Sequence, residues 1–153
     1  MKKLFLALSL LIPVLVSGQS QKAKSNGLIT RKSTYSVNET MAKVEQTLKD
    51  IGIPIFAKFD HGKNAEEAGL EMKPAQVIVF GSPKVGTNLM IANPSISIEL
   101  PLKIAVWEDK EGNVRVEFPD MMQLAARYGM ESNPIINNMQ TLLEKIVSKA
   151  TNM

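Results

Sequence analysis

The sequence contains no cysteine, one histidine, one tryptophan and only 5% aromatic residues among its 153 residues. The absence of cysteine excludes a disulfide framework, a thiolate zinc site, an iron–sulfur cluster and a cysteine nucleophile. A single histidine also excludes a multi-histidine metal site within one chain. We therefore expect neither a bound metal nor a cofactor.

What is present has the composition of an ordinary globular protein. Hydrophobic residues make up 44% of the chain and charged residues 22%, which argues against disorder, collagen-like repeats and coiled coils. No internal repeat or low-complexity segment is found. A chain of this length can bury a core without help from disulfides or metal, and one folded domain is the natural expectation.

The first eighteen residues have the pattern of a secretory signal peptide. Lys2 and Lys3 precede an apolar run from Leu4 to Val16, and small residues precede a cleavage site after Gly18. The run is too short for a membrane-spanning helix, which needs about 20 apolar residues, and no later segment is long and apolar enough. We expect residues 1–18 to be removed and the protein to be exported to the periplasm or the extracellular space.

Cleavage at this site changes the charge of the protein. It would leave 16 basic and 15 acidic residues, a net charge of +1, so the basic isoelectric point of the whole chain overstates the basicity of the mature protein. No stripe of lysine and arginine remains that would favour nucleic acid as a partner. Residues 19–26 are polar and are expected to form a flexible leader, and residues 27–153 a single domain.

The remaining pattern alternates between strand and helix signals. Ser36 and Glu39 form a capping box at the start of a helix that Gly52 ends, and Asn133 and Pro134 begin the last helix. Alternating apolar and β-branched residues predict five strands. They are Leu28 to Tyr35, Ile53 to Asp60, Ala75 to Phe80, Leu102 to Glu108 and Val114 to Phe118. Short helical segments are expected at Asn64 to Ala68 and Met121 to Tyr128, and a hairpin turn at Asp109 to Asn113.

This order predicts an α+β fold, β-α-β(4)-α, with a mostly antiparallel sheet and two long helices on one face. In the second strand, Ile53, Ile55, Ala57 and Phe59 are expected on the same face. The face of the sheet without helices is expected to carry Ile78, Phe80, Ala105 and Trp107. A second copy of the chain would cover such a face, so we expect a homodimer with twofold symmetry.

Two segments are candidates for a functional site. His61 follows a strand and precedes Gly62, and an imidazole there could act as a general base, bind a metal ion, contact a ligand or simply stabilise a turn. The second candidate is the segment Gly81 to Thr87, expected to be a loop. Its glycines, hydroxyls and lysine suit a small anion, although it lacks the ending of a phosphate-binding Walker loop.

The stretch from Asp60 to Trp107 resembles a known bacterial family, domain of unknown function 302. The matching motifs are Asp60-His61, Gly69-Leu70, Phe80-Gly81-Ser82-Pro83-Lys84-Val85-Gly86-Thr87, Asn93-Pro94, Leu100-Pro101-Leu102-Lys103, Val106-Trp107-Glu108-Asp109 and Leu124-Ala125-Ala126-Arg127-Tyr128-Gly129. The resemblance covers residues 27 to the last helix. It implies a TATA-binding-protein-like β-α-β(4)-α fold that is commonly dimeric and has no established activity.

These observations lead to three hypotheses. In the first, an exported homodimer binds a small polar or anionic ligand, and the candidate binding residues are His61, Ser82, Lys84, Gly86 and Thr87. In the second, the protein is an enzyme in which His61 is the general acid or base and Lys84 stabilises negative charge, with Tyr128 or Glu108 nearby. In the third, it is a structural or partner-binding dimer. The first two require His61 and Lys84 to share one solvent-accessible hollow.

Overall fold

The structure is a computed structural model and describes residues 26–152, so the expected signal peptide and most of the expected leader lie outside the described residues. The elements in chain order are β1 (Leu28–Ser33), α1 (Val37–Asp50), β2 (Ile55–Asp60), α2 (His61–Glu67), β3 (Ala75–Phe80), α3 (Pro83–Ala92), the 3₁₀ helix η1 (Pro94–Glu99), β4 (Leu102–Glu108), β5 (Val114–Pro119), α4 (Met121–Tyr128) and α5 (Pro134–Thr151).

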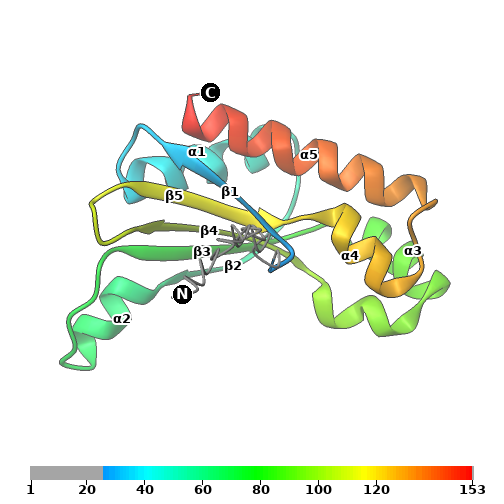
Figure 1. The fold of residues 1–153 in the computed structure, drawn as a ribbon, viewed down its shortest axis with the longest axis horizontal. Helices are drawn as coiled ribbons and strands as arrows, with labels where there is room; N and C mark the ends of the chain where they lie inside the picture. The colour runs from blue at the N-terminus through cyan, green and yellow to red at the C-terminus, as the bar shows by residue number, and fades with distance from the viewer. Residues whose placement is uncertain (1–25, 153) are drawn as a thin grey trace, which may run out of the picture.

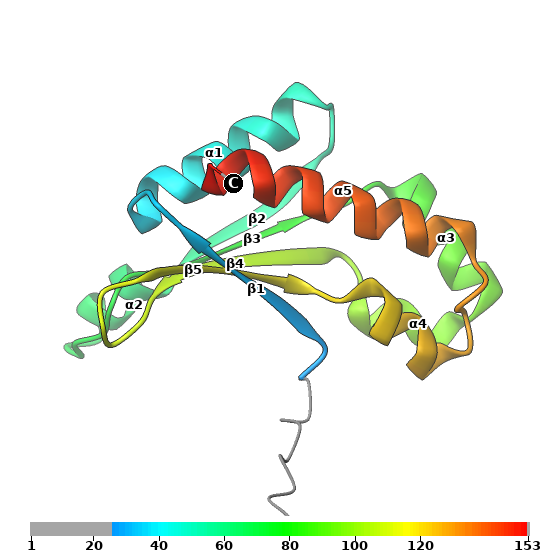
Figure 2. The same cartoon turned by 45° about the horizontal axis from the view of Figure 1, so that its top comes forward.

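The five strands form one sheet in the order β1-β5-β4-β3-β2, and every neighbouring pair is antiparallel. The two long helices, α1 and α5, pack side by side over one face of this sheet (Figures 1 and 2). The α+β architecture predicted from the sequence, with two long helices on one face, is therefore confirmed. The predicted order of the strands and long helices is also found, with α2, α3 and η1 between the strands.

Local sequence signals determine the ends of α1. The Ser36 side chain accepts a hydrogen bond from the Glu39 backbone N–H, while the Glu39 carboxylate accepts one from the Ser36 backbone N–H. This is the predicted capping box, and it satisfies amide groups that the first helical turn leaves without partners. At the other end, Gly52 has a φ of 70°, a left-handed conformation that glycine adopts without steric cost.

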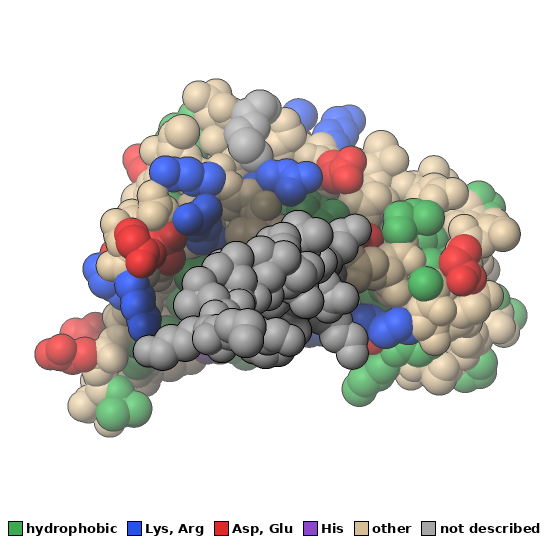
Figure 3. All heavy atoms as spheres, in the orientation of Figure 1, with side chains coloured by type: hydrophobic (Ala, Val, Ile, Leu, Met, Phe, Trp, Pro, Cys, Tyr) green, Lys and Arg blue, Asp and Glu red, His purple; other side chains and the backbone are tan. Residues whose placement is uncertain are grey.

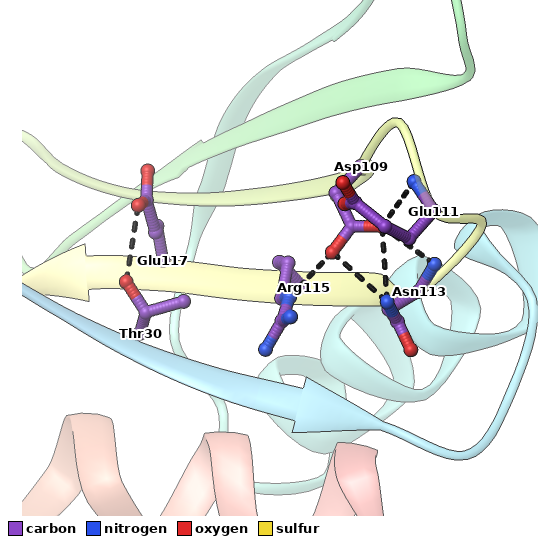
Figure 4. A network of polar contacts seen from close by, with 6 residues as sticks. All are labelled: Thr30, Asp109, Glu111, Asn113, Arg115 and Glu117. Carbon is purple, nitrogen blue, oxygen red and sulfur yellow. Dashed lines mark hydrogen bonds and ion pairs between the residues drawn. The ribbon is translucent and has the colours of Figure 1, made fainter.

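The turn between β4 and β5 is held by the carboxylate of Asp109 (Figure 4). Its Oδ1 accepts hydrogen bonds from the backbone N–H groups of Glu111 and Asn113, and its Oδ2 accepts one from Arg115 Nε at 2.9 Å. Partial desolvation acts to raise the pKa of Asp109. The hydrogen bonds from Asn113 and Arg115 outweigh it and hold this pKa below its usual range. The predicted hairpin turn is confirmed.

The core lies between the sheet and the pair of helices. Ile78 and Phe80 of β3 belong to it, since they are 0% and 1% exposed. Our expectation that these two residues lie on the uncovered face is therefore wrong. Residues that pair directly across antiparallel strands share a face, and Ile78 pairs with Ile104, which is also buried. The alternation of β3 was predicted correctly, but its two faces were assigned the wrong way round.

The face opposite α1 and α5 is called the uncovered face below. Val77 pairs with Ala105 and Ala75 pairs with Trp107, so this face carries apolar residues on β3 and β4. It also carries charged residues, since Ala105 pairs with Glu117 and Trp107 with Arg115. Phe59 of β2, which pairs with Val77, adds a phenyl ring that is 48% exposed. The assignment of Ala105 and Trp107 to this face is confirmed.

Strand β2 contains an irregularity that the alternating pattern conceals. The register shifts between Ile55 and Ala57, because Ile55 pairs with Phe80 while Ala57 pairs with the adjacent Val79. Phe56 is the extra residue of this β-bulge. Ile55 therefore faces the core, whereas Ala57 and Phe59 face the other side. The expectation that Ile55, Ala57 and Phe59 share one face is wrong for this reason.

The surface of the described residues carries charges of both signs. In the view of Figure 3, lysine, arginine, aspartate and glutamate side chains lie close together over the β4–β5 hairpin, where Arg115 pairs with Asp109 and Lys73 pairs with Glu108. Among residues 26–152, the structure has no helix that combines the length and the hydropathy needed to cross a bilayer.

Candidate functional site

The two candidate segments lie at opposite ends of the sheet. His61 directly follows β2 and Gly81 directly follows β3, and these strands are antiparallel neighbours in which Asp60 pairs with Gln76. The end of one strand therefore lies beside the start of the other. Six residues of β3 at about 3.3 Å per residue separate the two segments by roughly 17 Å. Figure 1 shows α2 at one end of the sheet and α3 at the other. The prediction that His61 and Lys84 share one hollow is wrong.

His61 begins a helix and does not form a turn. It is the first residue of α2 and is exposed, and its ring stacks on that of Phe59 with 6.4 Å between centroids and 11° between planes. The helix begins here because the side chain of Asp60 accepts a hydrogen bond from the Lys63 backbone N–H, as an N-cap residue does. The imidazole therefore lies on an exposed edge beside an apolar ring.

Asp60 is the centre of a small polar cluster at the α2 end. Its Oδ2 accepts a hydrogen bond from Gln76 Nε2 at 2.8 Å, and the same amide group donates to Asn38 Oδ1 of α1, also at 2.8 Å. The Lys63 backbone N–H, assisted by Gln76, holds the pKa of Asp60 below its usual range, although some desolvation acts in the opposite direction. This cluster ties α1, β3 and α2 together.

The segment expected to be a loop is mostly the first turn of α3. Ser82 is the N-cap residue, Pro83 is the first residue of the helix, and the Ser82 carbonyl accepts hydrogen bonds from the backbone N–H groups of Val85 and Gly86. The Ser82 side chain makes no capping hydrogen bond. Lys84 is exposed. The proline at the first helical position, which costs no hydrogen bond, was the signal for a helix that our loop prediction missed.

A cavity of about 420 Å³, called the α3 pocket below, opens at this end of the molecule. Its walls come from the β2 end of the sheet, the start of α3, the segment before β4, and α5. They consist of Ile53, Phe56, Phe80, Gly81, Ser82, Pro83, Val85, Gly86, Thr87, Met90, Leu100, Pro101, Leu102, Met139 and Leu142. Its volume lies within the range of sites for small molecules.

The chemistry of the α3 pocket is overwhelmingly apolar. Ser82 and Thr87 are the only lining residues with polar side chains, and no lining residue has a side chain that ionises. Phe56, which the β-bulge introduces, is 52% exposed, so the cavity meets solvent beside its ring. Of the predicted binding residues, Ser82, Gly86 and Thr87 line this pocket, whereas His61 and Lys84 do not.

The other groups named for an enzyme mechanism are engaged elsewhere. The Tyr128 hydroxyl donates a hydrogen bond to Glu99 Oε1 at 2.9 Å, and Arg127 Nη2 donates to the same oxygen at 3.0 Å. Partial burial and the Glu99 carboxylate raise the pKa of Tyr128. Glu108 pairs with Lys73. Residues 26–152 contain no cluster of three or more histidine, aspartate or glutamate side chains that could hold a metal ion.

Sequence analysis missed most of the pocket's lining. Met139 and Leu142 belong to α5, the predicted last helix, but helix signals do not indicate which other elements pack against it. Phe56 was missed because a β-bulge leaves no signature in the hydrophobic alternation of six residues. The glycines and prolines between Gly81 and Leu102 were the available sequence signal for this pocket, because glycine lets other groups approach the backbone closely.

Comparison with known proteins gives a family and a fold. Residues 29–149 match the profile of the family described as "Domain of unknown function DUF302". The chain is 39% identical over 118 residues to "Fluoride-specific ion channel FluC 1" of Brucella suis biovar 1 (strain 1330), which covers 76% of this chain and 46% of that protein. "Fluoride-specific ion channel FluC 2" of Brucella melitensis biotype 1 has the same identity, with 44% of its length covered. The chain thus spans less than half the length of these relatives.

Among solved structures, the fold is similar to the crystal structure of an uncharacterised conserved DUF302 protein from Bacillus stearothermophilus. The TM-score is 0.63 and the sequence identity 21%, and the match covers 84% of this chain and 98% of the other. At this identity the likeness concerns the fold alone.

Proposed function

The chain belongs to the DUF302 family of domains of unknown function, and we propose that it is a binding module for a small, mostly apolar molecule held in the α3 pocket. The observation that carries the proposal is the cavity of about 420 Å³ whose lining is almost wholly apolar. Pockets of this volume with a few polar groups are the usual form of small-molecule sites. Ser82 and Thr87 supply those groups.

The proposed ligand is more apolar than the sequence alone indicated. A polar or anionic molecule was expected because His61 and Lys84 were expected to converge, and they lie at opposite ends of β2 and β3. An ionised ligand group inside the α3 pocket would lose hydration without gaining a charged partner, which is costly. Apolar contact with the side chains of α3 and α5 is instead the main source of affinity.

The neutral fluorophore N-phenyl-1-naphthylamine tests the pocket directly, because its emission rises when it leaves water. We expect saturable binding to the wild-type protein. Leu142→Trp puts an indole into the cavity and should weaken binding about tenfold or more, the equivalent of losing 1.4 kcal/mol of contact.

Thr141→Trp is the matched control, since it adds the same indole to the preceding position of α5, which is exposed and does not line the pocket. Binding should stay at the wild-type level in this variant. Equal affinity of the two tryptophan variants, or no binding by the wild-type protein, would reject the proposal. Circular dichroism of both variants checks that they fold.

We also propose that the chain forms a homodimer through the uncovered face. The supporting observation is the apolar surface of Phe59, Val77, Ala105 and Trp107 on strands that no long helix within residues 26–152 covers (Figure 2). Light scattering after size exclusion should give twice the chain mass at micromolar concentration. Trp107→Arg should shift the protein to the monomer, whereas Lys84→Arg should not. A wild-type monomer would contradict the dimer.

Export is proposed on the sequence pattern of residues 1–18 alone. If the pattern is a signal peptide, protein recovered from the periplasm or the medium should begin at Gln19. Protein that begins at Met1 and stays in the cytoplasm would contradict this proposal.

The name of the Brucella relatives describes fluoride conduction, and we propose that this activity belongs to the part of those proteins that the present chain does not match. Less than half of their length is matched, and no helix of residues 26–152 is suited to cross a bilayer. Vesicles reconstituted with this chain should therefore release fluoride no faster than empty vesicles. Faster release would show that this chain itself conducts fluoride and would contradict the proposal.

A further inference from the structure

Gly86 occupies a helical position that does not require glycine. It lies inside α3, and its φ is not among the positive values that mark Gly27, Gly52, Gly69, Gly112 and Gly129. A Cβ at Gly86 would meet only Leu100 Cδ1, at an ordinary contact distance of 3.6 Å. Alanine would therefore fit the folded chain, and it would favour the helix because glycine loses more backbone freedom on folding.

The pocket gives a reason for glycine at this position. Ser82, Gly86 and Met90 follow one another at intervals of four residues, so they lie on one side of the start of α3, and all three line the α3 pocket. Because Gly86 has no side chain, the helix backbone itself forms the wall there. A ligand can therefore approach α3 more closely at Gly86 than a Cβ would allow.

The rest of the lining favours an aromatic ligand. Two phenyl rings, Phe56 and Phe80, and two thioethers, Met90 and Met139, face the same cavity. Thioether sulfur makes favourable contacts with aromatic rings, and aromatic rings also favour one another in offset or edge-to-face geometry. A flat ring can use the close approach at Gly86, whereas a puckered aliphatic ring is too thick to benefit to the same degree.

We propose that the α3 pocket takes a neutral aromatic group, one face of which lies against the bare backbone of Gly86 while the thioethers of Met90 and Met139 contact the ring. This inference rests on the proposed binding function and names its ligand class. It also makes Gly86 a residue that determines specificity, at some cost in the stability of α3.

A matched pair of ligands tests the proposed preference of the α3 pocket for a flat ring. The compounds 1-naphthol and decahydro-1-naphthol share one carbon skeleton and one hydroxyl, and differ in that the second is saturated and puckered. We expect 1-naphthol to displace N-phenyl-1-naphthylamine at a concentration about fivefold lower or more. Met139→Leu conserves volume but removes a sulfur, so it should reduce this preference about twofold to threefold without abolishing probe binding. An equal or better displacement by the saturated compound would overturn the inference.

A matched pair of glycine variants tests Gly86. Gly86→Ala should raise the melting temperature by about 2–4 °C and yet weaken 1-naphthol binding about tenfold, because the added methyl group occupies the ligand's position. Gly62→Ala is the control: it lies in α2 outside the pocket, and its Cβ would come no closer than 3.4 Å to its nearest neighbour, Asp60 Oδ1. This control should leave affinity unchanged.

These outcomes separate the inference from the proposed function. If the wild-type protein does not bind the probe, the pocket function fails. If Leu142→Trp loses the probe while Gly86→Ala binds 1-naphthol like the wild type, the pocket stands and the role of Gly86 is overturned. If Gly86→Ala lowers both stability and affinity, the fold itself requires glycine there and the inference is again overturned.

Discussion

The two ends of the β2–β3 strand pair have similar local structure but differ in polarity and in the role of their N-cap residues. At each end a short segment leads from a strand into a helix: Asp60 begins α2 and Ser82 begins α3. The α2 end is polar and exposed, and its N-cap side chain is fully engaged. The α3 end is apolar and hollow, and its N-cap side chain makes no capping bond. The ionisable residues Asp60 and His61 lie at the α2 end, where the side chain of Asp60 stabilises the fold. The α3 end has the cavity but few polar side chains, so the position of ionisable residues in the sequence did not indicate the pocket.

The largest expected contrast concerns a phenylalanine at each end. Phe80→Ala should destabilise the protein by about 3–5 kcal/mol, because the ring is buried in the core and its loss leaves a cavity. Phe59→Ala, which removes a ring that is 48% exposed, should cost about 1 kcal/mol or less. Urea denaturation monitored by circular dichroism measures both. Because the proposed dimer would cover Phe59, the small cost applies to the monomeric Trp107→Arg background. A cost at Phe59 similar to that at Phe80 in this background would contradict the contrast.

The second contrast concerns the two helix caps. Asp60→Ala should cost about 1 kcal/mol, since the Lys63 backbone N–H loses its partner. Ser82→Ala should cost almost nothing through capping, because its side chain makes no such bond. Thermal unfolding of both variants measures the difference. A larger loss from Ser82→Ala than from Asp60→Ala would show that the caps are assigned to the wrong ends.

The third contrast is the pH dependence of the same caps. The pKa of Asp60 is lower in the folded protein than its usual value of 3.8, so its carboxylate stabilises the fold above that pH and loses this effect as the pH falls through the folded-state pKa. The difference in unfolding free energy between the wild type and Asp60→Asn should therefore shrink as the pH is lowered from 6 towards 3. The corresponding difference for Ser82→Ala should stay flat over this range.

The smallest effect is expected for ligand binding itself. No ionisable side chain lines the α3 pocket, and His61 lies at the other end of β2. The affinity for N-phenyl-1-naphthylamine should therefore change less than about twofold between pH 5.5 and 8, the range in which a histidine titrates. A pH-dependent change in affinity that His61→Gln removes would show that the two ends communicate.

Local signals in the sequence predicted the helices, strands and turns well, but contacts between segments far apart in the sequence could not be predicted. The capping box at Ser36 and the hairpin at Asp109 involve residues within a few positions of one another, so spacing alone identifies them. The meeting of His61 and Lys84 depended instead on which strand ends adjoin. That is decided by the pairing of β2 with β3, in which Asp60 lies opposite Gln76.

The pocket was unpredictable for a related reason. Its walls come from β2, β3, α3 and α5, so no window of the sequence contains the cavity. Ser82, Gly86 and Thr87 were identified for their suitability to bind an anion, and they line a cavity of a different character. The reversal of the faces of β3 has a similar origin: hydrophobic alternation gives the period of a strand, but packing against α1 and α5 decides which phase is buried.

The β-bulge at Phe56 also bears on self-association. Strand β2 is an outer strand of the sheet, and a free outer strand can recruit further strands from other molecules and seed aggregates. The extra residue interrupts the regular ladder there, and two positions on, Lys58 turns toward α1 and pairs with Glu45. A lysine directed inward and a broken ladder are both features that oppose such recruitment. The bulged residue that lines the pocket thus also makes β2 a poor template for amyloid-like growth.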